Sequence, residues 1–255
     1  MINLFKRGMP FYFAIFLLFF WEMAVYFLNI EPWILPAPSV IGKEVLALSG
    51  QLTAPVWATT QIAVSGLIIG TGIGILAAGM LHLFSLLRQM IYPLIILSQN
   101  IPMIALAPLL VMWFGFGVFP KVLVVSLICF FPVAVSLLGG LQDTDRTLIT
   151  YMKMAGASRM QIFFKCECPS ALPSFFSGLK LSATYSVMGA VIAEWLGAEN
   201  GVGVMMQLAS STFRTDRVFV TILLVAGLSL LFFALITLCE QAVTRKYKGS
   251  QRRTQ

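Results

Sequence analysis

Charged residues are scarce in this sequence, and their scarcity excludes most classes of soluble protein. Only 11% of the 255 residues are Asp, Glu, Lys or Arg, whereas 59% are hydrophobic. A soluble domain averages about 25% charged residues. The composition therefore predicts a polytopic membrane protein.

Residues that bind metals are also few. The sequence has one His and four Cys, and Cys166-x-Cys168 is the single close pair among them. This set offers no ligands for a closed metal site. We expect reduced, unpaired cysteines buried as small apolar residues, with no metal and no cofactor.

Motifs for nucleotide binding and catalysis are missing as well. The sequence contains no G-x-x-x-x-G-K-[S/T] phosphate loop, no catalytic triad and no paired carboxylate site. The glycines of residues 70–74 lie in an apolar run without a strand–turn–helix context, so they do not form a dinucleotide loop. The chain is not expected to be an enzyme, and a transporter built from it must take its ATPase from another subunit.

Six apolar runs are present, each long enough to enter a membrane. They cover about residues 11–28, 59–81, 91–114, 122–142, 172–197 and 218–239. A helix of about 20 residues crosses a ~30 Å hydrocarbon core. We therefore predict a single membrane domain, residues 1–255, with six spans.

The net charge of +7 reports topology rather than nucleic-acid binding, because the basic residues lie at the ends of the apolar runs. With the N-terminus inside, twelve of the 17 basic residues are cytoplasmic: Lys6, Arg7, Arg88, Arg146, Lys153, Arg159, Lys165, Arg245, Lys246, Lys248, Arg252 and Arg253. Four lie outside, namely Lys43, Lys121, Arg214 and Arg217, and Lys180 falls within a span. This excess of Lys and Arg predicts that both ends of the chain are cytoplasmic.

Two of the apolar runs contain glycines or prolines whose positions predict how the helices pack or break. Gly66, Gly70, Gly74 and Ala78 share one helix face, which predicts close packing against a second helix in lipid. The run 91–114 contains three prolines and is predicted to be broken, and freed carbonyls at a break are tolerated where protein or a water-filled cavity satisfies them. Residues 100–113 are therefore the first candidate for lining a translocation path, with Asn100, Pro102 and Trp113 as its named members.

The fifth run bears a small and polar stripe that ends in a carboxylate. Gly178, Ser182, Ser186, Ala190 and Glu194 follow one another at steps of four and so share a face. A charge near a helix centre costs about 2.5–3.5 kcal/mol and usually faces protein or water. The stripe either lines a passage, which would make Ser182, Ser186 and Glu194 path residues, or packs against a second copy of the chain.

Residues 143–171 form a charged segment between two apolar runs and must face water. A helix that Asp145 can cap ends near Ala155, Gly156 supplies a joint, and Ser158 can start a second short helix. Such a segment is suited to docking into a groove of a soluble partner. Its docking residues are predicted to be Tyr151, Lys153, Ala155, Gly156, Ala157, Ser158 and Arg159.

Residues 156–173 resemble the cytoplasmic loop of ABC importer permeases, through Gly156-Ala157-Ser158 and the later Pro169-Ser-Ala-Leu-Pro173. The acidic residue of the family's E-A-A pattern is replaced by Thr150. The string ILPAPS at 34–39 is similar to permeases of the nitrate, sulfonate, taurine and thiamine-precursor branch.

The resemblance implies a type I importer permease: six transmembrane helices and a cytoplasmic coupling-helix loop in a bacterial inner membrane. It also implies a cytoplasmic ATPase dimer, an extracytoplasmic solute-binding protein, a second permease copy and membrane lipid as partners, and no nucleic acid. The solute it favours is a thiamine pyrimidine precursor of the hydroxymethylpyrimidine type. Alkanesulfonate, taurine or nitrate is the alternative, although no anion-binding cluster is visible in the spans.

A secondary transporter is the rival from another class, with Glu194 and Lys180 coupling an ion to the solute. It predicts inverted repeats and paired broken helices, whereas the sequence shows one strongly broken span. His82 has no carboxylate close to it in sequence, so it is interpreted as an interfacial residue rather than a proton relay.

Overall fold

The computed structural model describes residues 2–251, with side chains at residue 9 and from 12 to 245. This part of the chain is helical throughout. Its elements are α1 (Ile2–Phe27), α2 (Pro38–Leu48), α3 (Thr53–Leu83), α4 (Ser85–Ser98), α5 (Met103–Phe114), α6 (Val118–Gln142), α7 (Arg146–Met154), α8 (Arg159–Ile162), the π-helix η1 (Phe163–Glu167), α9 (Cys168–Glu194), α10 (Val202–Ser211) and α11 (Thr215–Gln251). Arg252 and Arg253, counted above toward the cytoplasmic side, lie outside the described residues.

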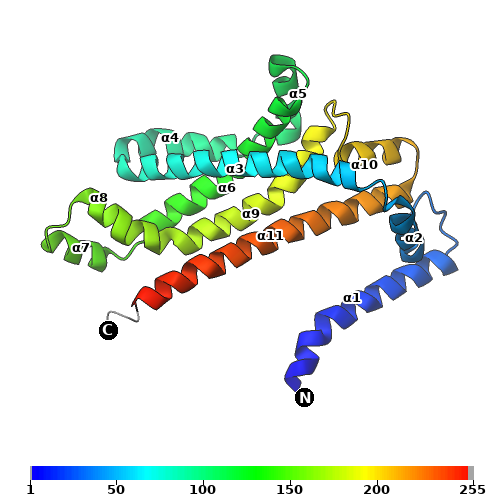
Figure 1. Ribbon diagram of the computed structural model, residues 1–255, viewed down its shortest axis with the longest axis horizontal. Coiled ribbons are helices and arrows are strands. Elements are labelled where there is room, and N and C mark those ends of the chain that lie inside the picture. Colours follow the sequence, from blue (N-terminus) through cyan, green and yellow to red (C-terminus); the bar gives the residue numbers. More distant parts are fainter. Residues whose placement is uncertain (1, 252–255) are drawn as a thin grey trace.

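Helices α3, α6 and α9 form the centre of the fold, and α11 packs on α9 (Figure 1). Glycines allow this close packing. A Cβ added at Gly70 of α3 would lie 2.4 Å from the Ser126 carbonyl oxygen of α6. A Cβ at Gly178 of α9 would lie 2.5 Å from the Pro132 carbonyl oxygen. The predicted small-residue face of α3 is confirmed, and the three helices meet nearly backbone to backbone.

We expect Gly70→Ala to lower the melting temperature of the purified protein in detergent. The added methyl group would meet backbone atoms of α6, and overpacking of this kind costs about 1–3 kcal/mol. Gly72→Ala is the matched control, because a Cβ at Gly72 meets nothing within 4 Å. Alanine is the better helix former by about 1 kcal/mol, so the control should melt no lower than wild type. Equal melting temperatures for the two variants would contradict the close packing of α3 on α6.

The third predicted span is broken, as its prolines indicated. Helices α4 and α5 are bent by 100° at the break, where Pro102 precedes the first residue of α5. In Figure 1, α5 runs upward, across the direction of α3 and α4. One side of α5, with Ala107 and Leu110, is buried, whereas other apolar side chains stay exposed within this chain, among them Met112 at 78% and Trp113 at 67%.

The fifth span begins earlier than its prolines suggested. The expected start near Leu172 is replaced by a helical run of 36 residues from Arg159 to Glu194. Its register changes at η1, where the Cys168 N–H donates to the Phe163 carbonyl five residues back. Pro169 lies in the first turn of α9, where a missing N–H is tolerated. The second half of the predicted loop 143–171 is therefore a helical extension of the span.

Among the residues that the structure describes, length and composition give four helices that could cross a membrane, or five if the bent α4–α5 pair counts as one span. The apolar part of α1, Tyr12–Phe27, is shorter than these, so the sixth span stays a prediction. Figure 1 places α7 and α8 at the same end of the bundle as the C-terminal end of α11, with α2 and α10 at the opposite end.

Two polar residues of the apolar helices have partners that local sequence did not reveal. Lys180 of α9, the basic residue that falls within a predicted span, forms an ion pair of 2.5 Å with Glu240 of α11. Ser39 is the second residue of α2, which Ala37 precedes. Its hydroxyl donates to Glu22 of α1 at 2.6 Å. Both contacts tie neighbouring helices together.

Candidate functional site

The loop that the sequence predicts to face water has the predicted order of helix, joint and helix. Asp145 caps α7, and its Oδ1 accepts the Thr147 N–H at 2.8 Å. Gly156 has φ +79°, a left-handed conformation that glycine adopts without strain. Ser158 caps α8 in a reciprocal capping box with Gln161. The predicted cap, joint and second helix start are confirmed as local geometry.

Helix α7 makes few contacts with the other helices, and none of its residues is buried. Leu148, Tyr151 and Met154 are 47%, 62% and 70% exposed. Their spacing of three puts them on one face of the helix, and the basic residue Lys153 lies on another face. An apolar row on a helix that faces water is typical of a protein-binding surface.

A buried cluster of charges joins the loop to α3. The Glu167 side chain, 3% exposed, accepts from Arg159 Nη1 at 2.6 Å and lies 2.8 Å from His82 Nε2. The His82 ring also stacks on Phe163 at 5.9 Å between centroids. His82 therefore has a carboxylate neighbour from 85 positions away, which corrects its interpretation as an isolated interfacial residue. Arg159, expected to face a partner, directs part of its guanidinium inward.

The polar stripe of α9 packs inside one chain. Ser182 Oγ donates to the Cys129 carbonyl of α6 at 2.8 Å, and Ser186 Oγ donates to the Ala183 carbonyl at 2.8 Å. Both serines have an exposed fraction of 0%. This arrangement differs from both expectations, a passage or contact with a second copy, because α3 and α6 already cover the stripe.

Glu194 ends the stripe as a helix cap. Its exposed fraction is 1%, its Oε1 accepts from Thr59 Oγ1 at 2.7 Å, and its Oε2 accepts the Gly203 N–H at 2.7 Å. Thr59 Oγ1 in turn accepts the Val202 N–H at 2.9 Å. The carboxylate therefore lies at the N-terminus of α10, where negative charge is favoured. Its position differs from the expected path-lining role.

Gly201 and Gly203 make room for this cap. A Cβ at either residue would come within 3 Å of the Glu194 carboxylate, and Gly201 also has φ +145°. The G-x-G after the fifth span is thus explained by the approach of the carboxylate to the backbone of α10.

The three predicted path residues of the broken span, Asn100, Pro102 and Trp113, lie on the surface of the chain. Asn100 Nδ2 donates to the Ile96 carbonyl at 3.1 Å and so helps to end α4. Pro102 precedes the first turn of α5, and Trp113 lies on its exposed side. All three are exposed, unlike Ser182, Ser186 and Glu194.

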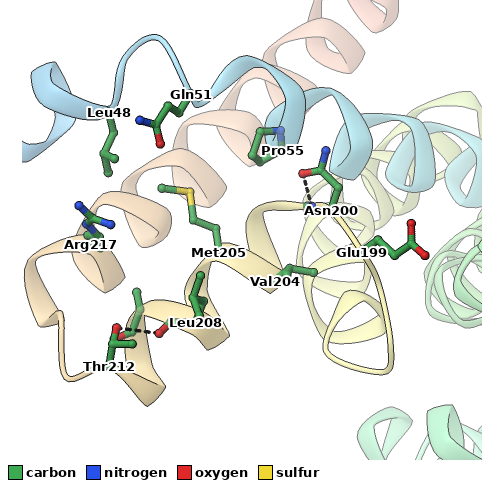
Figure 2. Close-up of a pocket in the computed structure, with 12 residues that line it drawn as sticks. Leu48, Gln51, Pro55, Glu199, Asn200, Val204, Met205, Leu208, Thr212 and Arg217 are labelled. Carbon is green, nitrogen blue, oxygen red and sulfur yellow. Dashed lines mark hydrogen bonds between the residues drawn. The ribbon is translucent and has the colours of Figure 1, made fainter.

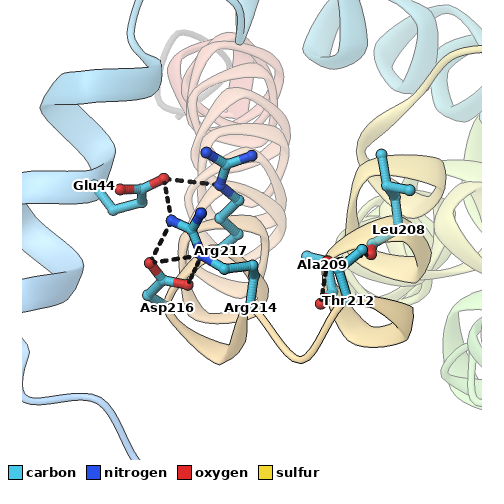
Figure 3. A network of polar contacts seen from close by, with 7 residues as sticks. All are labelled: Glu44, Leu208, Ala209, Thr212, Arg214, Asp216 and Arg217. Carbon is cyan, nitrogen blue, oxygen red and sulfur yellow. Dashed lines mark hydrogen bonds and ion pairs between the residues drawn. The ribbon is translucent and has the colours of Figure 1, made fainter. Parts of the chain in front are cut away.

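The end of the bundle opposite α7 and α8 has a cavity of 260 Å³ between α2, α3, α10 and α11. Figure 2 shows Leu48 and Gln51 across from Met205 and Arg217. An ion network holds its rim (Figure 3): Glu44 Oε1 lies 3.0 Å from Arg214 Nη2 and 2.8 Å from Arg217 Nε. Because Glu44 belongs to α2, the network attaches α2 to the start of α11.

Local sequence pointed to some of these residues and not to others. The spacing of Leu148, Tyr151 and Met154 was available as a signal on the predicted surface helix, and Leu148 and Met154 were overlooked. Glu167 and Thr59 gave no such signal, because each meets its partner across 85 and 135 positions of the chain.

A bundle of long apolar helices with a charged, exposed helix–glycine–helix at one end fits the class of membrane-embedded transport subunits. The chain belongs to the family described as the binding-protein-dependent transport system inner membrane component, which matches residues 70–245. This match covers the centre of the bundle, the exposed loop and the Glu194 cap.

Relatives of similar length are known. The chain is 35% identical to the formylaminopyrimidine transport permease protein ThiX of Halalkalibacterium halodurans, over 91% of this chain and 92% of the relative. It is 32% identical to the riboflavin transport system permease protein RibX of Chloroflexus aurantiacus, over 90% and 86%. The taurine transport system permease protein TauC of Escherichia coli is 31% identical, over 86% and 82%.

A solved structure supports the fold. The crystal structure of an amino acid ABC transporter with histidines contains a chain that matches 77% of this one with a TM-score of 0.63, covering 97% of its own length. The two sequences are 15% identical, so this likeness concerns the arrangement of the helices alone.

Proposed function

We propose that this chain is the permease subunit of an ATP-driven importer and forms the path for a small polar solute that a binding protein delivers. A separate pair of cytoplasmic subunits hydrolyses the ATP. The observation that carries the proposal is the exposed loop, in which an unburied α7 presents an apolar row beside the Gly156 joint. The family description, which names a binding-protein-dependent system, supports it.

In this proposal α7 docks into a groove of the ATPase as an amphipathic helix. The contact residues are Tyr151, Lys153, Ala155, Gly156, Ala157, Ser158 and the exposed part of Arg159, together with Leu148 and Met154. Thr150 stands where the family has an acidic residue, so the apolar row supplies most of the docking free energy. Alternating access follows if the loop makes different contacts with the two states of the ATPase.

The path itself lies between two copies of the chain in a bacterial inner membrane, with both chain ends cytoplasmic. The support for a second copy is α5, which runs across the direction of α3 and α4 with exposed apolar side chains. Asn100, Pro102 and Trp113 lie on this segment and line the path in the assembled pair. Lipid and the second copy together cover the remaining apolar surface.

The first candidate for the solute is a thiamine pyrimidine precursor. Its support is the relative of 35% identity, whose name states formylaminopyrimidine transport. The riboflavin permease relative also handles a nitrogen heterocycle. Sulfonate or taurine is the second candidate, through the relative of 31% identity and through a buried lysine described below. An ion-coupled mechanism has less support, because Lys180 pairs with Glu240 and Glu194 caps α10.

We expect Gly156→Val to reduce solute uptake per ATP hydrolysed by about tenfold. A β-branched residue at φ +79° is strained by roughly 1–2 kcal/mol, so the joint would leave the docked conformation. The measurement is formylaminopyrimidine or taurine uptake together with phosphate release, in liposomes that hold the permease, its ATPase and its binding protein.

Gly156→Asn is the matched control, because asparagine tolerates the left-handed region and a Cβ at this position meets nothing within 4 Å. It should keep most of the coupling. A Gly156→Val protein with the wild-type ratio of uptake to hydrolysis would remove the joint from the mechanism, and failure of the permease to co-purify with any ATPase would overturn the proposed function itself.

A further inference from the structure

A second cavity, of 410 Å³, lies at the end of the bundle away from α7 and α8. Its walls come from α3, the turn between α5 and α6, the first turn of α6 and the segment after α9. Its polar and aromatic lining residues are Gln61, Phe116, Lys121, Glu199 and Asn200. From the sequence, Lys121 was predicted only to be a basic residue on the outer side of the membrane.

Lys121 is buried in the wall of this cavity. Its exposed fraction is 8%, and among the described residues its ammonium group takes part in none of the hydrogen bonds or ion pairs of the side chains. The Lys121 nitrogen is not among the buried, unpartnered side-chain atoms of the described residues, so the charge opens onto the cavity and is available to a solute group. The carboxylate of Glu194 acts on Lys121 from within the protein, but its two oxygens already accept from Thr59 and Gly203.

The backbone beside Lys121 adds a second source of positive potential. Gly117 precedes α6, and no side chain caps that helix. The cavity is lined by Gly117 and Val118, so the N-terminal end of a 25-residue helix opens onto it. Such an end attracts anionic or electron-rich groups. Asn200 Oδ1 accepts the Gly201 N–H, which leaves the Asn200 amide nitrogen as a further donor.

We propose that this cavity is a solute-binding subsite in which Lys121 and the N-terminus of α6 hold an electron-rich oxygen of the transported solute. The shared chemistry has two sources, the sulfonate of a taurine-like solute or the carbonyl oxygen of a formylaminopyrimidine. The ring of Phe116 covers the apolar part of the solute. This inference rests on the proposed transport function and adds the residue that recognises the solute.

The test compares Lys121→Met, Lys121→Arg and wild type, with Lys43→Met as the matched control. Lys43 lies at the same end of the bundle on α2 and is exposed. Taurine and formylaminopyrimidine are the probes, first as stabilisers of the purified permease in thermal unfolding and then as solutes in liposomes with the complete transporter. Binding to the folded state raises the melting temperature.

One probe is expected to raise the melting temperature of wild type and of Lys43→Met. The same probe should raise the melting temperature of Lys121→Met by much less. Uptake of the same probe should fall about tenfold in Lys121→Met, because a charge-assisted hydrogen bond is lost, and Lys121→Arg should restore part of it. The probe that stabilises the wild-type protein shows whether the bound oxygen belongs to a sulfonate or to a formyl group. The basal melting temperature of Lys121→Met should drop little, since Lys121 forms no direct ion pair among the described residues and acts on Glu194 only from beyond ion-pair distance.

Three results would overturn the inference. The first is that neither probe stabilises wild type. The second is that Lys121→Met takes up the active probe at the wild-type rate. The third is that Lys121→Met loses bound phospholipid while its uptake is unchanged. The last result would assign Lys121 to a lipid headgroup. In each case wild-type uptake that requires ATP would leave the proposed transport function standing, so the two failures are distinguishable.

Discussion

Glu194→Ala is expected to lower the melting temperature of the purified protein by about 10 °C, the largest effect of any single substitution considered. The change leaves the Gly203 N–H without its buried acceptor and leaves the Thr59 hydroxyl with the Pro55 carbonyl at 3.1 Å as its acceptor. Each unsatisfied group costs about 1–3 kcal/mol, and truncating a buried charged group costs roughly 3–5 kcal/mol in total. One kcal/mol shifts the melting temperature by about 2–4 °C in a chain of this size.

Glu31→Ala is the control for this experiment, because Glu31 is an exposed carboxylate near the same end of the bundle. It should melt like wild type. Glu194→Gln should fall between the two, since one amide oxygen can replace one of the two acceptors. If Glu194→Ala folds and melts like wild type but transports poorly, the carboxylate serves the path, and its role as the cap of α10 is wrong.

Glu167→Ala is expected to release the loop from α3 and to uncouple ATP hydrolysis from uptake. The substitution removes the partner of Arg159 and His82 from a site that is 3% exposed. Arg159 is 47% exposed and can be hydrated after the change, so the cost is smaller than for a fully buried ion pair. The cost falls on the junction between α8 and α3, because the three side chains come from these elements and η1.

Hydrogen exchange of the backbone amides measures this effect directly. Amides of residues 146–162 should exchange faster in Glu167→Ala than in wild type, while those of α6 and α9 change little. Asp143→Ala is the matched control, because Asp143 is an exposed carboxylate just ahead of α7. Unchanged exchange in Glu167→Ala would show that the buried cluster does not hold the loop.

These two expectations concern contacts that lie far apart in the sequence, and local patterns could not reveal them. Thr59 and Glu194 are 135 positions apart, and His82 and Glu167 are 85 apart. A stripe at steps of four tells which residues share a face of α9, but it does not tell which helix covers that face. The same pattern of Ser182, Ser186 and Glu194 is compatible with a passage, a second copy or the interior of one chain.

Patterns with a local physical cause were predicted well. The Gly156 joint, the Asp145 cap and the Ser158 cap depend on residues within a few positions of one another. The break in the third span follows from prolines that lie within it. The glycine row of α3 was likewise readable, because close approach in lipid requires small residues wherever the partner helix comes from.

The amino-acid sequence by itself determined that this chain is a helical membrane protein with a water-facing, glycine-jointed loop and that it resembles an importer permease. Composition, apolar run length and the positions of Gly and Pro decide those features locally. Only the tertiary structure decided that Glu194 caps a helix, that Glu167 fastens the loop, and that Lys121 lines a cavity with no direct ion-pair partner among the described residues. The physical reason is that the environment of a charge in an apolar bundle depends on which helices surround it, and this is set by packing between distant segments.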